Sequence, residues 1–331
     1  MSNKNLIVTR SPLRISLGGG GTDIPFYFKK YGSFFISCAI NKHVYICINE
    51  INEKKYFLRY SKNETVENVN DIKHNLFREV LKFYNIKPGV EIMSFADLPS
   101  GTGLGSSGAF LCSLILALDI YTENKRSNVE IAKLASKIEI ENLEETVGYQ
   151  DTLISAIGGL TAFSIDKKTN IEYKKNFITS EKIKKLENSL LLIDTNTKRS
   201  SSKELEKTMS KAKNKEILIE NLHQIKQLGY DSHKLLKDQN NRLLGQVLTE
   251  QWKKKLERSK SKYHLYVDGL ISEINLLGAY GAKLIGAGGG GYILTFIPKS
   301  KISDLKTLIE TYNLNIIDFQ ITNTGVSKFD L

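Results

Sequence analysis

Residues 99–122, PSGTGLGSSGAFLCSLILALDIYT, join a glycine-rich loop to a long apolar run. The run from Gly108 to Thr122 is too long for one strand and predicts a buried helix, opened by Ser106 and Ser107, which can also cap it. Glycine loses more conformational entropy on folding than any other residue, so clustered glycines indicate a close approach to the backbone. Amide groups at a helix N-terminus attract anions. The stretch therefore predicts a site for a phosphate chain, with a structural turn as the alternative.

Two common phosphate-binding motifs fit this loop poorly. Gly103, Gly105 and Gly108 match the GxGxxG spacing of dinucleotide-binding proteins. In that fold the first glycine follows a strand closely and an acid ends the next strand, whereas here a proline-containing loop intervenes and a second helix follows the first. A Walker A loop requires a lysine before the serine, and none precedes the serine pair.

Two further glycine clusters occur in the chain. SPLRISLGGGGTD spans residues 11–23 and GAKLIGAGGGGY spans residues 281–292. Three such loops indicate one large anionic ligand. The net charge of +11, from 47 Lys and Arg against 36 Asp and Glu, also favours an anion. Because no basic run is interleaved with aromatic residues, small phosphorylated ligands are favoured over nucleic acid.

Length and patterning predict two domains. The chain has 331 residues, and its hydrophobic content of 41% is ordinary for a globular protein. A polar, lysine-rich stretch at 174–188 separates a strand-rich part from a mostly helical part, so we expect domains over 1–185 and 186–331. Strands are expected at 5–18, 33–40, 43–51, 55–61, 90–99, 160–165 and 189–195, and helices at about 72–84, 108–122, 128–145, 201–230 and 232–277.

Cysteine usage and the N-terminal sequence bear on the compartment. Cys38, Cys47 and Cys112 each lie in apolar sequence without paired spacing, which indicates buried free thiols in a reducing environment. The N-terminal sequence lacks a signal-peptide core, and the longest apolar stretch, 109–118, is too short to span a bilayer. A cytoplasmic protein is expected. The histidines show no transition-metal spacing.

The three glycine motifs, in this order and spacing, resemble those of the GHMP kinases, a family that includes galactokinase, homoserine kinase and mevalonate kinase. Residues 11–23 resemble the first motif of that family, residues 99–109 the second and residues 281–292 the third, so the resemblance covers essentially the whole chain. It implies an α+β fold, with an N-terminal domain like domain 2 of ribosomal protein S5 and a ferredoxin-like C-terminal domain. It also implies that ATP and the acceptor bind in the cleft between them.

The resemblance assigns roles around the second motif. Ser107 and Glu139 are expected to bind Mg²⁺, for which oxygen ligands are suited. From the sequence alone, Glu139 could equally lie on a solvated helix face, because acidic residues crowd around it. The ATP phosphates are expected to bind Pro99, Gly101, Gly103, Leu104, Gly105, Ser106, Ser107 and Gly108.

Asp151, in GYQDTLISAIGG, resembles the catalytic aspartate of galactokinase and mevalonate kinase, which takes the proton from the acceptor hydroxyl. Arg14 stands where these enzymes carry an arginine or a lysine, and a cation there can pair with the base and stabilise developing charge. The alternative for Asp151 is a helix cap.

The first motif bears on the acceptor. Galactokinases share its Thr-Asp pair, and a carboxylate that only accepts hydrogen bonds suits a polyol. The GGGTD form resembles kinases of the anomeric hydroxyl of fucose, glucuronate and D-glycero-D-manno-heptose 7-phosphate. Arg199 is a candidate clamp for a second phosphate, with a solvated loop as the equal alternative. Substrate contacts are therefore expected at Gly18, Gly19, Gly20, Gly21, Thr22, Asp23, Arg199, Gly288, Gly289 and Gly290.

The function expected from this resemblance is ATP-dependent phosphorylation of the heptose 7-phosphate to the 1,7-bisphosphate, a step in GDP-heptose and surface polysaccharide synthesis. The alternatives are a fucose or glucuronate 1-kinase and a catalytically silent member that senses sugar and ATP. Expected partners are ATP, Mg²⁺ and a sugar phosphate, without nucleic acid or membrane, and a homodimer is an expected assembly.

Overall fold

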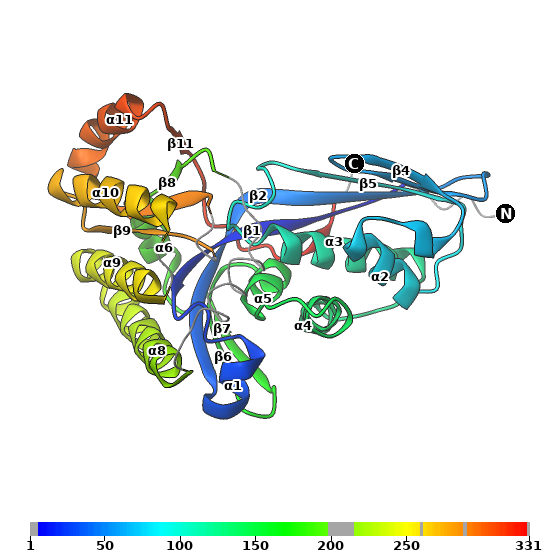
Figure 1. Ribbon diagram of the computed structural model, residues 1–331, viewed down its shortest axis with the longest axis horizontal. Coiled ribbons are helices and arrows are strands. Elements are labelled where there is room, and N and C mark those ends of the chain that lie inside the picture. Colours follow the sequence, from blue (N-terminus) through cyan, green and yellow to red (C-terminus); the bar gives the residue numbers. More distant parts are fainter. Residues whose placement is uncertain (1–5, 198–214, 259–260, 287–289, 330–331) are drawn as a thin grey trace.

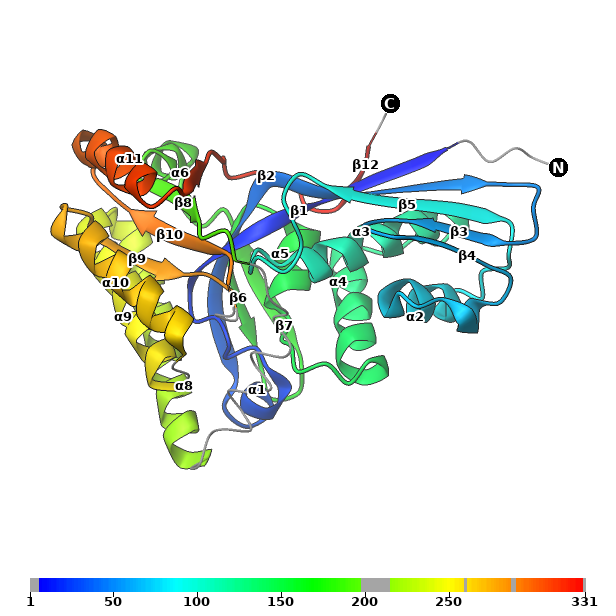
Figure 2. The same ribbon diagram turned by 45° about the horizontal axis from the view of Figure 1, so that its top comes forward.

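Two β-sheets organise the part of the chain that the structure describes. The computed structural model describes residues 6–197, 215–258, 261–286 and 290–329. Within these ranges an eight-stranded sheet lies beside a four-stranded one, each with its own helices (Figures 1 and 2). Fold class α+β is confirmed.

The large sheet is built on two long antiparallel strands, β1 (Ile7–Gly18) and β2 (Ser33–Glu50). Its strand order is β12-β1-β2-β5-β3-β4, and β6 pairs with the first part of β2 and with β7. The pairing of β1 with β2 is irregular between Pro12 and Arg14, beside the catalytic candidate. The remaining strands are β3 (Tyr56–Arg59), β4 (Asn63–Val66), β5 (Val90–Ala96), β6 (Leu160–Ile165), β7 (Ile171–Lys175) and β12 (Ser327–Lys328).

Helices cover one face of the large sheet (Figure 2). The central one, α3 (Ser106–Tyr121), is apolar on all sides and almost entirely buried, as expected of a core helix. Around it lie α2 (Asn75–Phe83), α4 (Asn128–Lys137) and α5 (Gln150–Ile157), and a short helix, α1 (Pro25–Tyr31), follows the first glycine cluster. α3 therefore carries the second glycine motif into the centre of the molecule.

The small sheet has the order β11-β8-β10-β9, antiparallel throughout. In chain order this is 4-1-3-2, which is the ferredoxin-like arrangement expected from the resemblance. Its strands are β8 (Leu190–Asp194), β9 (Gly281–Leu284), β10 (Tyr292–Phe296) and β11 (Asn315–Ile317), and its helices are α8 (Lys215–Asp238), α9 (Asn241–Arg258), α10 (Lys262–Leu276) and α11 (Ile302–Thr311).

Several element predictions need correction. The strands expected at 33–40 and 43–51 form one strand, β2, because the pairing with β1 resumes after a register shift that leaves residues 40–42 without a partner on β1. The predicted break near residue 231 is wrong, since α8 continues to Asp238 and the helix break follows at Gln239, whose φ is 56°. The lysine-rich stretch contains the end of β7 and the whole of α6 (Ser180–Glu187), and most of their polar residues are exposed. The boundary proposed at 185/186 falls within α6.

The main hydrophobic core joins both sheets. It includes Phe35 from the large sheet and Leu192 and Leu294 from the small one. A second cluster around Trp252 lies between the small sheet and its helices. The three cysteines are buried and free. No helix within the described ranges is long and apolar enough to cross a membrane.

Candidate active site

The second and third glycine motifs meet through their backbones. A Cβ on Gly103 would come within 2.8 Å of the Ile285 carbonyl oxygen, and one on Gly291 within 1.8 Å of the Thr102 carbonyl oxygen. Gly103 and Gly291 also have φ of 78° and 109°, in the region that favours glycine. The glycines at these positions therefore allow the two loops to pack together.

The helix start of the second motif is open. Gly105, with φ of 75°, is the N-cap of α3 and provides no side-chain cap, so the predicted capping by Ser106 and Ser107 is wrong. Both serines are the first residues of the helix, where their backbone amides have no partner within it. This leaves the N-terminus of α3 suited to an anion.

The other residues of the second motif have structural contacts. Pro99 is exposed, and its carbonyl accepts a hydrogen bond from the Thr102 hydroxyl at 2.9 Å. Leu104 is buried, and its carbonyl accepts from the Arg14 amide at 2.9 Å. Within the motif, only Ser107 lines the central cavity. Gly108 does not line the cavity and packs against the backbone of α5.

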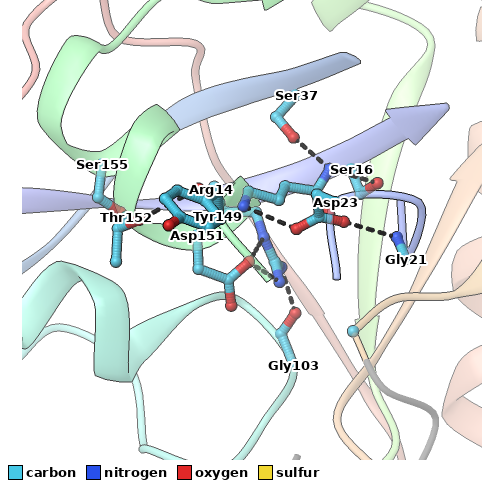
Figure 3. Close-up of polar contacts among 12 residues, drawn as sticks. Arg14, Ser16, Gly21, Asp23, Ser37, Gly103, Tyr149, Asp151, Thr152 and Ser155 are labelled. Atoms are coloured by element: carbon cyan, nitrogen blue, oxygen red, sulfur yellow. Dashed lines mark hydrogen bonds and ion pairs between the residues drawn. The ribbon is translucent and has the colours of Figure 1, made fainter. Parts of the chain in front are cut away.

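Arg14 and Asp151 form an ion pair at the centre of the site (Figure 3). Arg14 Nε donates to Asp151 Oδ1 at 2.8 Å, and the second contact, from Nη2, is 2.6 Å. Arg14 Nη1 donates to the Gly103 carbonyl at 2.5 Å, which ties the pair to the phosphate loop. Arg14 is 5% exposed, whereas the Asp151 side chain is 30% exposed and lines the cavity. Asp151 is not a cap, because Tyr149 is the N-cap of α5.

Asp23 lies beside this pair, held by backbone amides. Its Oδ1 accepts from the Gly21 amide at 2.9 Å and its Oδ2 from the Gln150 amide at 2.8 Å. Any Cβ on Gly148 would come within 2.0 Å of Asp23 Oδ2, so this position requires glycine. Burial raises the pKa of Asp23, and the charge of Asp151 adds to the shift. Gly20, Gly21 and Asp23 line the cavity.

The remaining residues of the first motif, Gly18, Gly19 and Thr22, do not line the cavity and have packing contacts, so their expected substrate contacts stay predictions. Gly18 and Gly19 lie where α8 and β2 cross, and a Cβ on Gly19 would come within 2.1 Å of the Phe34 carbonyl oxygen. Thr22 is fully buried, and its hydroxyl hydrogen-bonds to the Gly19 carbonyl at 2.8 Å and to the Ser33 hydroxyl at 2.9 Å.

Ser107 and Glu139 meet in the cavity through a hydrogen bond. Glu139 lies in a π-helical turn, Ile138–Asn142, that continues α4, and single π-turns often occur at functional sites. It is 5% exposed, so the solvated-face alternative is wrong. Burial, followed by the charges of Asp151 and Glu145, raises the pKa of Glu139 to about 8, against the effect of the Ser107 hydrogen bond.

These two side chains fit a magnesium ion. In the described residues Glu139 forms no ion pair, so its buried charge is uncompensated. Mg²⁺ is often bound by one or two side-chain oxygens together with phosphates and water. Within the described ranges no group of three or more His, Cys, Asp or Glu residues could hold a metal.

Three cations of the cavity were not predicted. Lys255 and Arg258 lie on α9 and Lys283 on β9, and all three line the same cavity of about 150 Å³ as Arg14. Burial, with Arg14 nearby, lowers the pKa of Lys283 to about 7. The spacing of Lys255 and Arg258, three residues apart on a helix, was the available signal, but lysine-rich helices are frequent in this chain.

Some predicted contacts lie outside the described residues, namely Arg199, Gly288 and Gly289. Gly290 is described, has φ of 156°, and packs on the Thr197 carbonyl oxygen. It does not line the cavity, whereas Gly286, earlier in the same motif, does.

The sequence of the chain is similar to those of known proteins. The family model described as the GHMP kinases N terminal domain matches residues 69–159, and the model described as GHMP kinases C terminal matches residues 232–308. The chain is 28% identical over 339 residues to the D-glycero-alpha-D-manno-heptose 7-phosphate kinase of Campylobacter jejuni, covering 98% of each chain. It is 25% identical to a galactokinase of Thermotoga petrophila, over 92% of this chain and 93% of that protein.

A solved structure shares the fold. The D-glycero-D-manno-heptose 1-phosphate kinase from Bacteroides thetaiotaomicron aligns with a TM-score of 0.79 at 20% identity, over 98% of this chain and 99% of that one. The expected fold, with its two kinds of domain, is thereby confirmed. Since both domains are matched in order and the fold is shared along nearly the whole chain, the protein belongs to the GHMP kinase family.

Proposed function

We propose that the protein transfers the γ-phosphoryl group of ATP to the anomeric hydroxyl of D-glycero-D-manno-heptose 7-phosphate, giving the 1,7-bisphosphate. The observation that carries the proposal is the Asp151 carboxylate, paired with Arg14 and facing a cavity between the start of α3 and Asp23. The choice of sugar is supported by the Campylobacter relative, which is named for this substrate. A cytoplasmic location and a role in surface polysaccharide synthesis belong to the same proposal.

Each part of the reaction has a candidate in the cavity. Asp151 accepts the proton of the acceptor hydroxyl, and Arg14 holds the carboxylate in place while leaving its exposed side open. Asp23 accepts hydrogen bonds from sugar hydroxyls. Ser107 and Glu139 would hold Mg²⁺, which neutralises charge on the phosphates when bound. The amides at the start of α3 bind the phosphate chain.

The direct test is turnover on a panel of acceptors. The wild-type protein is incubated with ATP, Mg²⁺ and one acceptor at a time: the heptose 7-phosphate, fucose, glucuronate or galactose. ADP release measures turnover, and phosphorus NMR of the product locates the new phosphate. Highest kcat/KM on the heptose 7-phosphate, with a new phosphate at C1, is expected. Preference for fucose or glucuronate would replace the sugar assignment, and absence of turnover with all of them would favour the silent alternative.

Asp151→Asn tests the base. The amide still accepts a hydrogen bond from Arg14 but takes no proton, so kcat should fall about 10²–10⁴-fold. Circular dichroism should show a folded protein. As a matched control, Asp304→Asn changes a half-exposed aspartate paired with Lys301 and should keep wild-type kcat. A near-normal rate for Asp151→Asn would exclude the base role.

A further inference from the structure

Three basic side chains that line the cavity have no ion pair with an acid in the described part of the chain. Lys255 Nζ donates to the carbonyls of Leu284, at 3.2 Å, and of Gly286. Lys283 Nζ donates to Gln251 Oε1 at 2.9 Å. Neither lysine, nor Arg258, forms an ion pair within the described ranges.

Arg258 is the least satisfied of the three. Its Nε is buried and has no hydrogen-bond partner among the residues that the structure describes. Burial lowers the pKa of Arg258 to about 10, and it lowers that of Lys255 well below its ordinary value, with Arg258, Lys283 and Arg14 as repelling neighbours. Lys283 is buried, and Lys255 and Arg258 are half-buried. The charge of Glu257 acts favourably on Arg258, but no ion pair within the described ranges compensates the three cations, so this wall of the cavity suits an anion.

Position separates Arg258 from the triphosphate site, whereas Lys255 contacts the third motif, which packs on the second. The open helix start and Ser107 belong to α3, whereas Arg258 lies against the first motif, with its Nη1 3.9 Å from where a Cβ on Gly21 would be. Asp23, in the same motif, is held by amides and not by Arg258. Arg258 therefore lies on the acceptor side.

We propose that Arg258, supported by Lys255 and Lys283, binds a phosphate that the acceptor sugar already carries before the reaction. The inference rests on the proposed sugar kinase function and names the residue that would bind the phosphate of its acceptor. The acceptor hydroxyl points to Asp151 and its own phosphate to Arg258, whose planar guanidinium suits phosphate oxygens.

Arg258→Ala tests the inference with matched acceptors, D-glycero-D-manno-heptose and its 7-phosphate. Losing a charged hydrogen bond should raise KM for the 7-phosphate about 10–100-fold. The rise should exceed that for the unphosphorylated heptose and that for ATP by about tenfold, and Arg258→Lys should be intermediate. Lys253→Ala, which removes an exposed charge from the solvent side of α9, is the matched control and should keep wild-type constants.

The outcomes separate the inference from the proposed function. Equal rises for both heptoses, or a rise confined to ATP, would overturn the inference, the latter by assigning the cations to the triphosphate. If Arg258→Ala does not fold, Arg258→Lys and the wild-type protein test the inference in its place. The wild-type KM should be at least about tenfold lower for the 7-phosphate than for the heptose. Failure of the wild type on every sugar would instead overturn the proposed function.

Discussion

At the scale of single residues, the cavity places charged groups where each is costly alone. The carboxylate of Asp151 is paired with Arg14, and that of Asp23 accepts hydrogen bonds from two backbone amides. The carboxylate of Glu139 is stabilised only by the hydrogen bond with Ser107. A buried carboxylate without a cation binds its proton more tightly. Glu139 is therefore a residue whose state should change when a cation binds beside it.

Glu139→Gln should change how stability depends on pH in the ligand-free protein. The pKa of Glu139 is raised from 4.5 to about 8 in the folded state. Its contribution to stability is thus full below about pH 4.5 and is lost as the pH rises toward about 8. The Tm of the wild type should fall by roughly a few °C relative to Glu139→Gln between pH 5 and pH 8.

The same variant tests the magnesium assignment. Mg²⁺ with a non-hydrolysable ATP analogue should restore the wild-type Tm at pH 8 but stabilise Glu139→Gln much less. Glu310→Gln, at an exposed position on α11, is the matched control and should track the wild type. Parallel Tm curves for wild type and Glu139→Gln would contradict an uncompensated Glu139.

At the scale of elements, the contact between α3 and α5 positions the base. A Cβ on Gly108 would come within 2.8 Å of the backbone of Asp151 and Thr152. The two helices thus approach closely because Gly108 has no side chain, and Asp151 reaches Arg14 from that position. Gly108, in the first turn of α3, therefore sets the position of Asp151 through packing.

Gly108→Ala should push α5 away and misplace Asp151. We expect a loss of about 1–3 kcal/mol in the free energy of unfolding, as for overpacking, and a lower kcat. Gly269→Ala is the matched control, because Gly269 is also helical but has open space around it. It should be neutral or stabilising by up to about 1 kcal/mol. Urea denaturation checks both, and equal effects of the two variants would contradict the packing role.

At the scale of the whole molecule, the two sheets share a core, and residues of both parts line the candidate active site. The main hydrophobic cluster contains residues of both sheets, and the second and third glycine motifs touch across them. The last strand, β12, returns to pair with β1. The two predicted domains are therefore connected by packing, by the chain end and by the cavity.

Unfolding should accordingly occur in one transition. Trp252, the single tryptophan, lies in the second cluster and reports on the small sheet, while far-ultraviolet circular dichroism reports on the whole chain. Midpoints from the two probes should agree within about 2 °C, as for a two-state protein. A fluorescence transition that precedes the loss of circular dichroism by many degrees would show that the two parts unfold independently.

Local sequence was enough for much of the fold and for part of the site. Runs of apolar and β-branched residues predicted α3, β1 and β8, and all three elements are largely buried. The helix α6 was missed because it is short and mostly polar. Glu139 was ambiguous, since ordinary helix spacing does not reveal a π-turn. The catalytic and binding roles of the motif residues stay predictions.

By itself, the sequence determined the family, the two kinds of domain and the candidates Arg14, Asp23, Ser107 and Asp151, because glycine-rich loops with attached polar residues are local patterns. Only the tertiary structure decided which of the many basic residues face the cavity. Lys255, Arg258 and Lys283 come from a helix and a strand that meet the first and third motifs only after both sheets have packed. Packing decides whether a basic residue has an acidic neighbour, because its position in the sequence does not show which side chains will lie beside it.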